Sequence, residues 1–181
     1  AVSLEPSRTC VVYGHGGEAV PEAMVAYAAS FVIQEPQLGT GHAVQQAMPQ
    51  LQDDSYTLVL YGDVPLIQAT TLKQLLQTPD KLNLLTLRMD NPTGYGRIVR
   101  NDAGKVISIV EEKDAIPSQK AICEVNTGIL SAPTHLLRNW LARLGNNNAQ
   151  GEYYLTDIVA MAVAEGVEVS TTQPAHDWEV M

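Results

Sequence analysis

Short apolar runs alternate with stretches of helical periodicity along the first half of the chain. The apolar runs predict strands, and the periodic stretches between them predict helices. The predicted strands are 9–13, 30–34, a run that begins at 56, and 82–89, and the predicted helices are about 21–28, 41–50 and 70–77. Strands that alternate with helices at this spacing indicate βαβ units. We therefore expect an α/β fold with a mostly parallel sheet and helices on both faces.

The second half of the chain follows a different pattern. Residues 97–113, "RIVRNDAGKVISIVEEK", predict two strands around the turn "NDAG", and so a small hairpin subregion. A strand at 123–132, helices at 133–145 and 153–166, and a closing strand at 167–172 follow. A chain of 181 residues suits one domain rather than two.

Composition and charge narrow the class of protein. The chain is 45% hydrophobic and 17% charged, which is typical of a globular protein. Its net charge of −9 argues against nucleic acid or an anionic membrane as a partner. An anionic small molecule stays possible, because a metal ion can offset its charge. Cys10 and Cys123 lie in separate apolar stretches, so we interpret them as reduced core residues of a cytoplasmic protein. No stretch approaches the roughly 18 apolar residues of a membrane span.

One carboxylate follows a buried segment directly. In "YTLVLYGDVPLI", residues 56–67, an apolar run ends in Gly62 and Asp63. Asp63 has two interpretations on this pattern. It is either a turn residue whose carboxylate bonds nearby backbone N–H groups, or a ligand-binding residue at the carboxyl end of a strand, where open α/β sheets bind their ligands.

A glycine-rich turn precedes the predicted helix at 41. In "QEPQLGTGHA", Gly39 and Gly41 permit close backbone approach, and free N–H groups at a helix N-terminus favour an anion or a carbonyl oxygen. The amide of Gln34 offers an acceptor beside a donor, which matches the edge of a uracil. Such turns are common, and Thr40 is also a plausible N-cap.

The hairpin region carries a second group of polar residues. "NPTGYGRI" at 91–98 is a glycine-containing turn around Tyr95, and it is either structural or part of a site. Glu111 and Glu112 should point to opposite faces, because side chains alternate along a strand, so one of them should face solvent or a ligand. Asn126 interrupts an apolar run and needs a hydrogen-bond partner. A carboxylate and an amide on neighbouring strands can grip sugar hydroxyls. The scattered histidines and the absence of a nucleophile motif argue against a histidine-based metal site and a covalent intermediate.

Six motifs in register now resemble one family. "QLGTGHA", "LYGDVPL", "NPTGYGRI", "IVEEKDA", "EVNTGIL" and "NNNAQGEYYLTDI" are similar to the uridyltransferase domain of the bacterial bifunctional N-acetylglucosamine-1-phosphate uridyltransferase/glucosamine-1-phosphate acetyltransferases. The resemblance covers nearly the whole chain. It implies a Rossmann-like nucleotidyltransferase fold and formation of UDP-N-acetylglucosamine and pyrophosphate from UTP and N-acetylglucosamine 1-phosphate. It also implies Mg²⁺ as the cofactor and a place in peptidoglycan and lipopolysaccharide synthesis.

The resemblance assigns roles to particular residues. On the nucleotide side, the uracil contacts correspond to Gln34, Gly39 and Thr40, and the segment beside the ribose and phosphates to Tyr61, Gly62 and Asp63. Asp63 matches the family's magnesium-binding aspartate, and it is the one residue we expect to be catalytic. On the sugar side, the residues that hold N-acetylglucosamine correspond to Gly96, Glu111 and Asn126, with Tyr154 and Thr156 lining the same side.

Parts of the family pattern have no match in residues 1–181. They are an upstream glycine-rich loop whose Arg and Lys wrap the UTP phosphates, a downstream Asn that also binds magnesium, and the β-helical acetyltransferase domain. We therefore expect a partial nucleotidyltransferase domain that lacks the loop unit and the β-helix. Alone, it should be inactive and bind UDP-N-acetylglucosamine weakly. A homotrimer is expected only of the full-length family protein.

Two alternatives stay open. One is another sugar-1-phosphate nucleotidyltransferase with a different base or sugar, although Gln34 and "GEYYLTDI" favour uridine and N-acetylglucosamine. The other is a non-catalytic module that binds a nucleotide sugar.

Overall fold

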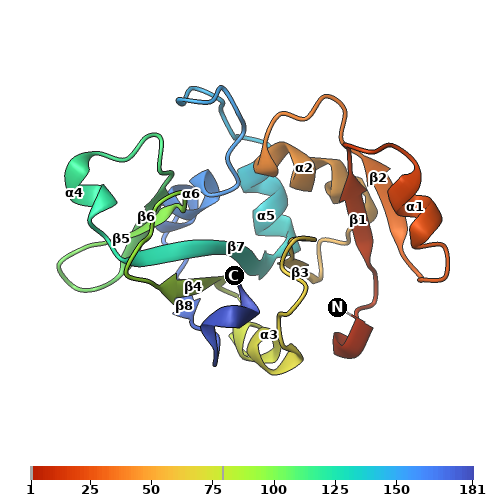
Figure 1. The fold of residues 1–181 in the computed structure, drawn as a ribbon, viewed down its shortest axis with the longest axis horizontal. Coiled ribbons are helices and arrows are strands. Elements are labelled where there is room, and N and C mark those ends of the chain that lie inside the picture. The colour runs from red at the N-terminus through yellow and green to blue at the C-terminus, as the bar shows by residue number, and fades with distance from the viewer. Residues whose placement is uncertain (1, 79) are drawn as a thin grey trace.

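The structure is a computed structural model, and it describes residues 2–78 and 80–181. Its first half alternates strands and helices as predicted (Figure 1). The elements are η1 Val2–Leu4, β1 Cys10–Tyr13, α1 Ala19–Ala23, β2 Ser30–Ile33, α2 Thr40–Ala47, η2 Met48–Gln50, β3 Tyr56–Val59, α3 Ala69–Leu75 and β4 Leu82–Arg88. Helix α1 ends at Ala23 rather than at 28. Val25 beyond it is 84% exposed, so the apolar residues there have no core face to hold a longer helix.

The second half contains the predicted hairpin. Its elements are β5 Arg97–Arg100, β6 Val106–Val110, α4 Pro117–Lys120, β7 Glu124–Pro133, α5 Thr134–Leu141, α6 Asp157–Ala164, β8 Val169–Thr172 and η3 Asp177–Glu179. The side chain of Asn101 accepts hydrogen bonds from the N–H groups of Ala103 and Lys105 and so closes the "NDAG" turn. The short helices α4 and η3 were not predicted.

The main sheet is mixed, so the expectation of a mostly parallel sheet was wrong. Its order is β6-β5-β7-β4-β8, and β3 also pairs with β7. Strand β7 runs antiparallel to β3, β4 and β5, whereas β4 and β8 are parallel. A parallel pair of β1 and β2 forms a separate small sheet. The sequence pattern misleads because β4 and β7 are buried on both faces, which produces the continuous apolar runs usual for parallel strands.

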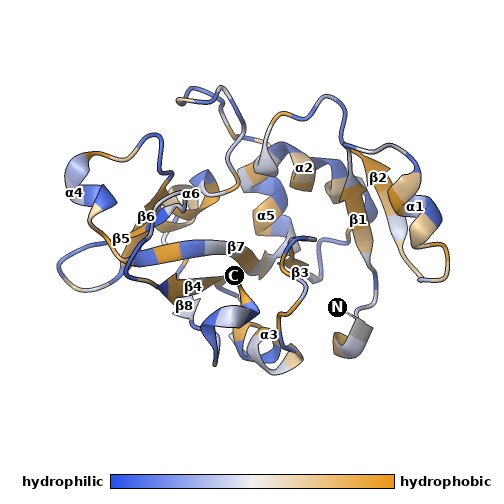
Figure 2. Ribbon diagram, viewed as in Figure 1, coloured by the Kyte–Doolittle hydropathy of each residue, from blue (hydrophilic) through white to orange (hydrophobic). Residues whose placement is uncertain are grey.

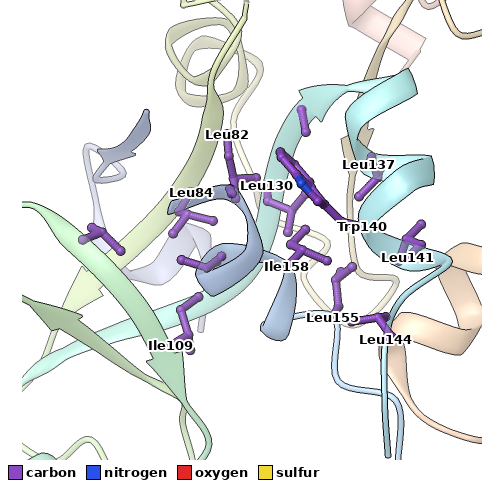
Figure 3. Packing of buried hydrophobic residues seen from close by; sticks show 14 of the residues in the cluster. Leu82, Leu84, Ile109, Leu130, Leu137, Trp140, Leu141, Leu144, Leu155 and Ile158 are labelled. Carbon is purple, nitrogen blue, oxygen red and sulfur yellow. The ribbon is translucent and has the colours of Figure 1, made fainter. Parts of the chain in front are cut away.

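Helices cover both faces of the main sheet, as predicted. On β4, Leu82 and Leu84 join one core cluster and Leu85 and Leu87 the other. The first cluster includes Trp140 of α5 and neighbouring residues of α6, whose side chains meet between the helices and the sheet (Figure 3). The second cluster is covered by α3. Apolar residues accordingly concentrate on the strands and on the helices beside them, and the connecting loops are mostly hydrophilic (Figure 2).

Strand β7 pairs with two separate parts of the molecule along its length. Its C-terminal half pairs with β3 from Leu130 to Pro133, and its start pairs with β5 at Val125. Figure 1 shows β3 near one end of β7 and the β5/β6 hairpin near the other. Because β3 and β5 both run against β7, the end of β3 faces the start of β5. Residues 126–129 lie in the interval between them, and the candidate site forms there.

Candidate active site

The end of β3 is fixed against β7 by an aromatic ring. Gly128 has φ +87°, and a Cβ at this position would lie 2.6 Å from Cε2 of Tyr61. Only a glycine allows both the left-handed backbone and this approach. Sequence reasoning missed Gly128, although a glycine inside a strand pattern signals close approach of another group.

The start of β5 contributes Gly96 to the same interval. Its carbonyl oxygen accepts a 2.9 Å hydrogen bond from the N–H of Asn126. The side-chain oxygen of Asn126 in turn accepts from the N–H of Gly128 at 3.1 Å, which is the partner that its place in an apolar strand required. A Cβ at Gly96 would lie 3.4 Å from both carboxylate oxygens of Glu111, so the glycine brings bare backbone next to this acid.

The two glutamates after β6 diverge, as predicted. Glu111 turns into the site, where Thr156 donates a 2.8 Å hydrogen bond to its Oε1. Glu112 turns away and forms a 2.6 Å ion pair with Arg97. Burial, with smaller contributions from the charges of Asp157 and Asp114, raises the pKa of Glu111 although the bond from Thr156 opposes the shift.

Two tyrosine hydroxyls lie near the Glu111 carboxylate. Burial and the charges of Glu111 and Asp63 raise the pKa of Tyr61, against a hydrogen bond from Thr40 that lowers it. Burial and then the charges of Asp114 and Glu111 raise the pKa of Tyr154 to about 12. Among the described residues the buried hydroxyl of Tyr154 has no partner at hydrogen-bond geometry, although the Asp114 carboxylate lies close enough to interact with it. A buried hydroxyl without a partner is costly, so a polar ligand group would satisfy it.

The segment that carries Tyr154 is irregular rather than helical, so the predicted helix start at 153 was wrong. Helix α6 begins at Asp157, and the residues before it pack against the glycine turn ahead of α2. Tyr153 donates its N–H to the carbonyl oxygen of Leu38 and accepts from the N–H of Gly41, both at 2.8 Å. These backbone pairings hold the segment in place of the first helical turn.

The glycine turn packs against the segment around Tyr153, a contact that the sequence predicted only in part. The predicted close backbone approach is confirmed, because a Cβ at Gly39 or Gly41 would lie 2.8 Å from the carbonyl oxygen of Tyr153. The N–H of Gly41 binds a carbonyl oxygen, one of the two expected partners, but that oxygen belongs to Tyr153 of the chain itself, so this N–H is not free for a ligand. Thr40 begins α2 but does not cap it. Its hydroxyl accepts a 3.2 Å hydrogen bond from the N–H of Leu155.

Gln34 lies at the glycine turn before α2 rather than on the interval along β7. Its amide nitrogen donates to the carbonyl oxygen of Gly39 at 2.9 Å and contacts Nδ1 of His42 at 3.1 Å. Both amide hydrogens therefore brace the turn, and the side-chain oxygen is the atom suited to an incoming donor. A depression of about 400 Å³ adjoins it, lined by Gly14, Gly17, Ile33, Gln34, Glu35, Pro36 and Gln37.

Asp63 occupies an exposed turn at the end of the β3 segment. The N–H of Val64 donates to the carbonyl oxygen of Tyr61 at 3.4 Å, which places Gly62 and Asp63 at the two central positions. Residues 2–78 and 80–181 contain no group of three or more His, Cys, Asp or Glu side chains placed to hold a metal ion. Any metal at Asp63 would need most of its ligands from substrate and water.

The structure therefore unites most of the predicted site residues. Thr40, Tyr61, Gly96, Glu111, Asn126, Tyr154 and Thr156 converge on the interval along β7. Gln34 and Asp63 lie on its margins. Cys10 and Cys123 are free, as predicted, but only partly buried. Among the described residues, no helix has the length and apolar character needed to cross a membrane.

Comparison with known proteins identifies the family. The profile of the MobA-like NTP transferase domain matches residues 1–94, which is more than half of the chain. The chain belongs to this family. It is also 61% identical over 181 residues to the bifunctional protein GlmU of Janthinobacterium sp. (strain Marseille), and 57% identical over 186 residues to that of Bordetella petrii. These alignments cover 99% and 100% of the chain, and 40% and 41% of the two relatives. The resemblance carried by the six motifs is thereby confirmed.

Solved structures confirm the fold. A UDP-glucose pyrophosphorylase complexed with UDP-glucose superimposes with a TM-score of 0.73 at 15% identity, covering 91% of this chain and 72% of that one. A nucleotidyl transferase from Methanothermobacter thermautotroptrophicus gives 0.62 at 18% identity, covering 99% and 68%. The Rossmann-like nucleotidyltransferase architecture is therefore shared at identities too low to show a common substrate.

Proposed function

We propose that this chain forms the nucleotide-sugar site of a uridyltransferase, which joins UTP and N-acetylglucosamine 1-phosphate into UDP-N-acetylglucosamine with release of pyrophosphate. The observation that carries the proposal is the convergence of Glu111, Asn126, Thr156 and Tyr154 beside the bare backbone of Gly96. The similarity to the GlmU proteins supports the same choice of substrates.

The sugar side of the site suits a neutral, hydroxyl-rich ligand. Glu111 presents a carboxylate that already accepts from Thr156 and has capacity for further donors. Asn126 and the unpartnered hydroxyl of Tyr154 add an amide and a phenol. A sugar that lacked a matching hydroxyl or acetamido group would leave these groups without partners, so the site discriminates strongly.

The nucleotide side is placed at the adjoining margin. The Gln34 side-chain oxygen can accept from the N3–H of a uracil seated in the depression beside it. The ribose and phosphates would then pass Tyr61 and Gly62 toward the sugar residues. This order of contacts matches the order of groups in UDP-N-acetylglucosamine.

The chemistry needs no protein nucleophile. The sugar phosphate is an anion that attacks the α-phosphorus of UTP, and pyrophosphate leaves with the electron pair of the broken P–O bond. The protein must align the two substrates and offset their negative charge. Glu111 and Asn126 hold the sugar so that its phosphate oxygen points toward the nucleotide, while Gln34 and Tyr61 hold the other partner.

Mg²⁺ is the cofactor we propose, with Asp63 as its ligand in this chain. Mg²⁺ commonly takes one or two protein carboxylates and completes its shell with phosphate oxygens and water. An exposed carboxylate at the end of the β3 segment fits that requirement. When bound, the ion would neutralise phosphate charge.

The chain spans about 40% of the length of the curated relatives that it matches. The homotrimer, the cytoplasmic location and the place in peptidoglycan and lipopolysaccharide synthesis are therefore proposed for a full-length protein. A full-length protein of this kind is not expected to bind nucleic acid or membranes. A non-catalytic nucleotide-sugar module is the second candidate, because the binding residues are better defined than the phosphate contacts.

Two measurements test the proposal. Calorimetry on residues 1–181 should detect UDP-N-acetylglucosamine and show weaker binding of UDP-glucose, which lacks the acetamido group. A chimaera of the Janthinobacterium relative, in which this chain replaces the matching segment, should release pyrophosphate from UTP and N-acetylglucosamine 1-phosphate. Binding without turnover in the chimaera would favour the module, and failure of both would refute the proposal.

In the same chimaera, Asp63→Asn tests the metal assignment. The substitution keeps the shape of the turn and removes the charge, so the thermal melt should persist while Mg²⁺-dependent turnover falls by about a hundredfold or more. Unchanged turnover at limiting Mg²⁺ would return Asp63 to a turn-forming role.

A further inference from the structure

One charged side chain is fully buried directly behind the sugar side of the site. Arg97 is 1% exposed. Its Nη2 donates to Glu112 at 2.6 Å, and its Nη1 donates to the carbonyl oxygen of Tyr95. The same Nη2 lies 3.5 Å from the carbonyl oxygen of Lys120. One guanidinium therefore connects the turn before β5, the turn after β6 and the end of α4.

The buried arginine is an expensive feature for stability alone. Removing a guanidinium from water is strongly unfavourable, and apolar residues of similar volume often stabilise a protein as well or better. Its Nε also has no hydrogen-bond partner among the described residues. A charge retained under these conditions points to a need for fixed geometry, since the planar fork of arginine orients several acceptors at once.

The geometry that Arg97 fixes is that of two site residues. Gly96 precedes Arg97, and Glu111 precedes Glu112. Arg97 pairs with Val110 in the β5/β6 ladder, so Gly96 and Glu111 lie one position beyond that pair, where the ladder has ended. The ion pair closes the open end of the hairpin from the face opposite the site. It thereby holds the Glu111 carboxylate against Gly96 and, through the bond from Gly96 to Asn126, against β7.

We infer that the Arg97–Glu112 ion pair is a positioning element that sets the affinity of the site for the sugar part of its ligand. This inference rests on the proposed function. Neither side chain contacts the ligand in this scheme, so both act through the placement of Glu111 and Gly96. The proposed nucleotide contacts at Gln34 and Tyr61 belong to other elements, and Tyr61 reaches the sugar side through its packing on Gly128.

The chain offers a matched control on the same strand. Arg100, three positions along β5, donates to Glu124 from Nε at 2.8 Å and from Nη2 at 2.7 Å. This pair is also an arginine–glutamate contact across the sheet, but it lies at the end of β5 away from Gly96. Loss of the Arg100–Glu124 geometry should lower the stability of the fold without changing the affinity for the sugar part of the ligand.

The test compares two ligands that differ by the sugar. Calorimetry gives the Kd of UDP-N-acetylglucosamine and of UDP for the wild-type chain and for the variants Arg97→Lys, Glu112→Gln and Arg100→Lys, each checked by thermal melting. We expect Arg97→Lys and Glu112→Gln to weaken UDP-N-acetylglucosamine about tenfold, the effect of misplacing one hydrogen bond to a buried polar group. The Kd of UDP should change less than about twofold, and Arg100→Lys should leave both values unchanged.

The outcomes separate the inference from the function on which it rests. Equal weakening of both ligands, or no change in either, overturns the inference, because a merely structural pair would not select between them. If Arg97→Lys fails to fold, the Kd values of Glu112→Gln decide the test. Glu112 is partly exposed, and glutamine has the same shape as glutamate, so this variant should fold. A folded wild-type chain that binds neither ligand overturns the proposed function and the inference together.

Discussion

Replacement of Gly128 by alanine should weaken the chain in two separable ways. The backbone at Gly128 has φ +87°, and a side chain in the left-handed region costs about 1–2 kcal/mol. The new Cβ would also lie 2.6 Å from Cε2 of Tyr61, whereas carbon atoms in contact normally stay about 3.5–4.0 Å apart. Forcing the ring away is an overpacking change of about 1–3 kcal/mol. The sum is a loss of about 2–5 kcal/mol in the free energy of unfolding.

A second glycine separates the two contributions. Gly104, in the hairpin turn, has φ +76°, and a Cβ added there would meet nothing within 4 Å, so Gly104→Ala should cost only the backbone share of about 1–2 kcal/mol. Urea unfolding with linear extrapolation measures both variants. In a Tyr61→Ala background, the loss of unfolding free energy caused by Gly128→Ala should fall to the loss caused by Gly104→Ala. Equal losses for the two glycine variants in the wild-type background would refute the claim that the Tyr61 ring packs on Gly128.

Two further predictions concern buried carboxylates. Burial raises the pKa of Glu111, so its protonation stabilises the folded state; this contribution is complete below the ordinary pKa of 4.5 and is lost as pH rises through the folded value. Glu111→Gln should therefore be more stable than wild type at pH 7 and similar at pH 4 in thermal melts, and a difference independent of pH would contradict this. Glu179 is buried and accepts from Thr71 Oγ1 at 2.6 Å and from the N–H of Gln68 at 3.2 Å. The N–H of His176 donates to the same carboxylate at 3.1 Å. Glu179→Ala leaves all three donors without this acceptor and should lower the free energy of unfolding by about 2–4 kcal/mol, whereas an unchanged urea midpoint would show that water replaces the carboxylate.

The sequence predicted the order of elements well, because local patterns determine it. Most strands and longer helices lie where apolar periodicity placed them, and the "NDAG" hairpin formed through the side chain of Asn101. Strand direction could not be predicted in the same way. A strand buried on both faces has the same apolar run whether its neighbours are parallel or antiparallel, and β7 is the example.

The sequence predicted which residues form the candidate site better than it predicted the contacts between them. The divergence of Glu111 and Glu112 was predicted from strand alternation, and it is observed although both residues lie just beyond the end of β6 at Val110. The pairing of the 152–155 segment with the glycine turn at 39–41 depends on residues over a hundred positions apart, so no local pattern discloses it. The role of Arg97 was also missed. An arginine at the end of a short strand usually has a solvated side chain, so its burial could not be predicted from the local pattern.

The pairing of β7 with two different neighbours limits what the exchange of one hairpin could change. The proposed nucleotide side of the site is attached to one stretch of this strand through β3, and the proposed sugar side is attached to another stretch through the β5/β6 hairpin. The two sides meet at Asn126 and Gly128 of β7, where Asn126 bonds to Gly96 and Gly128 packs against Tyr61. Exchange of the β5/β6 hairpin would therefore replace Gly96 and Glu111 but would leave Asn126 on β7 in place, so a new binding preference would also require changes outside the hairpin.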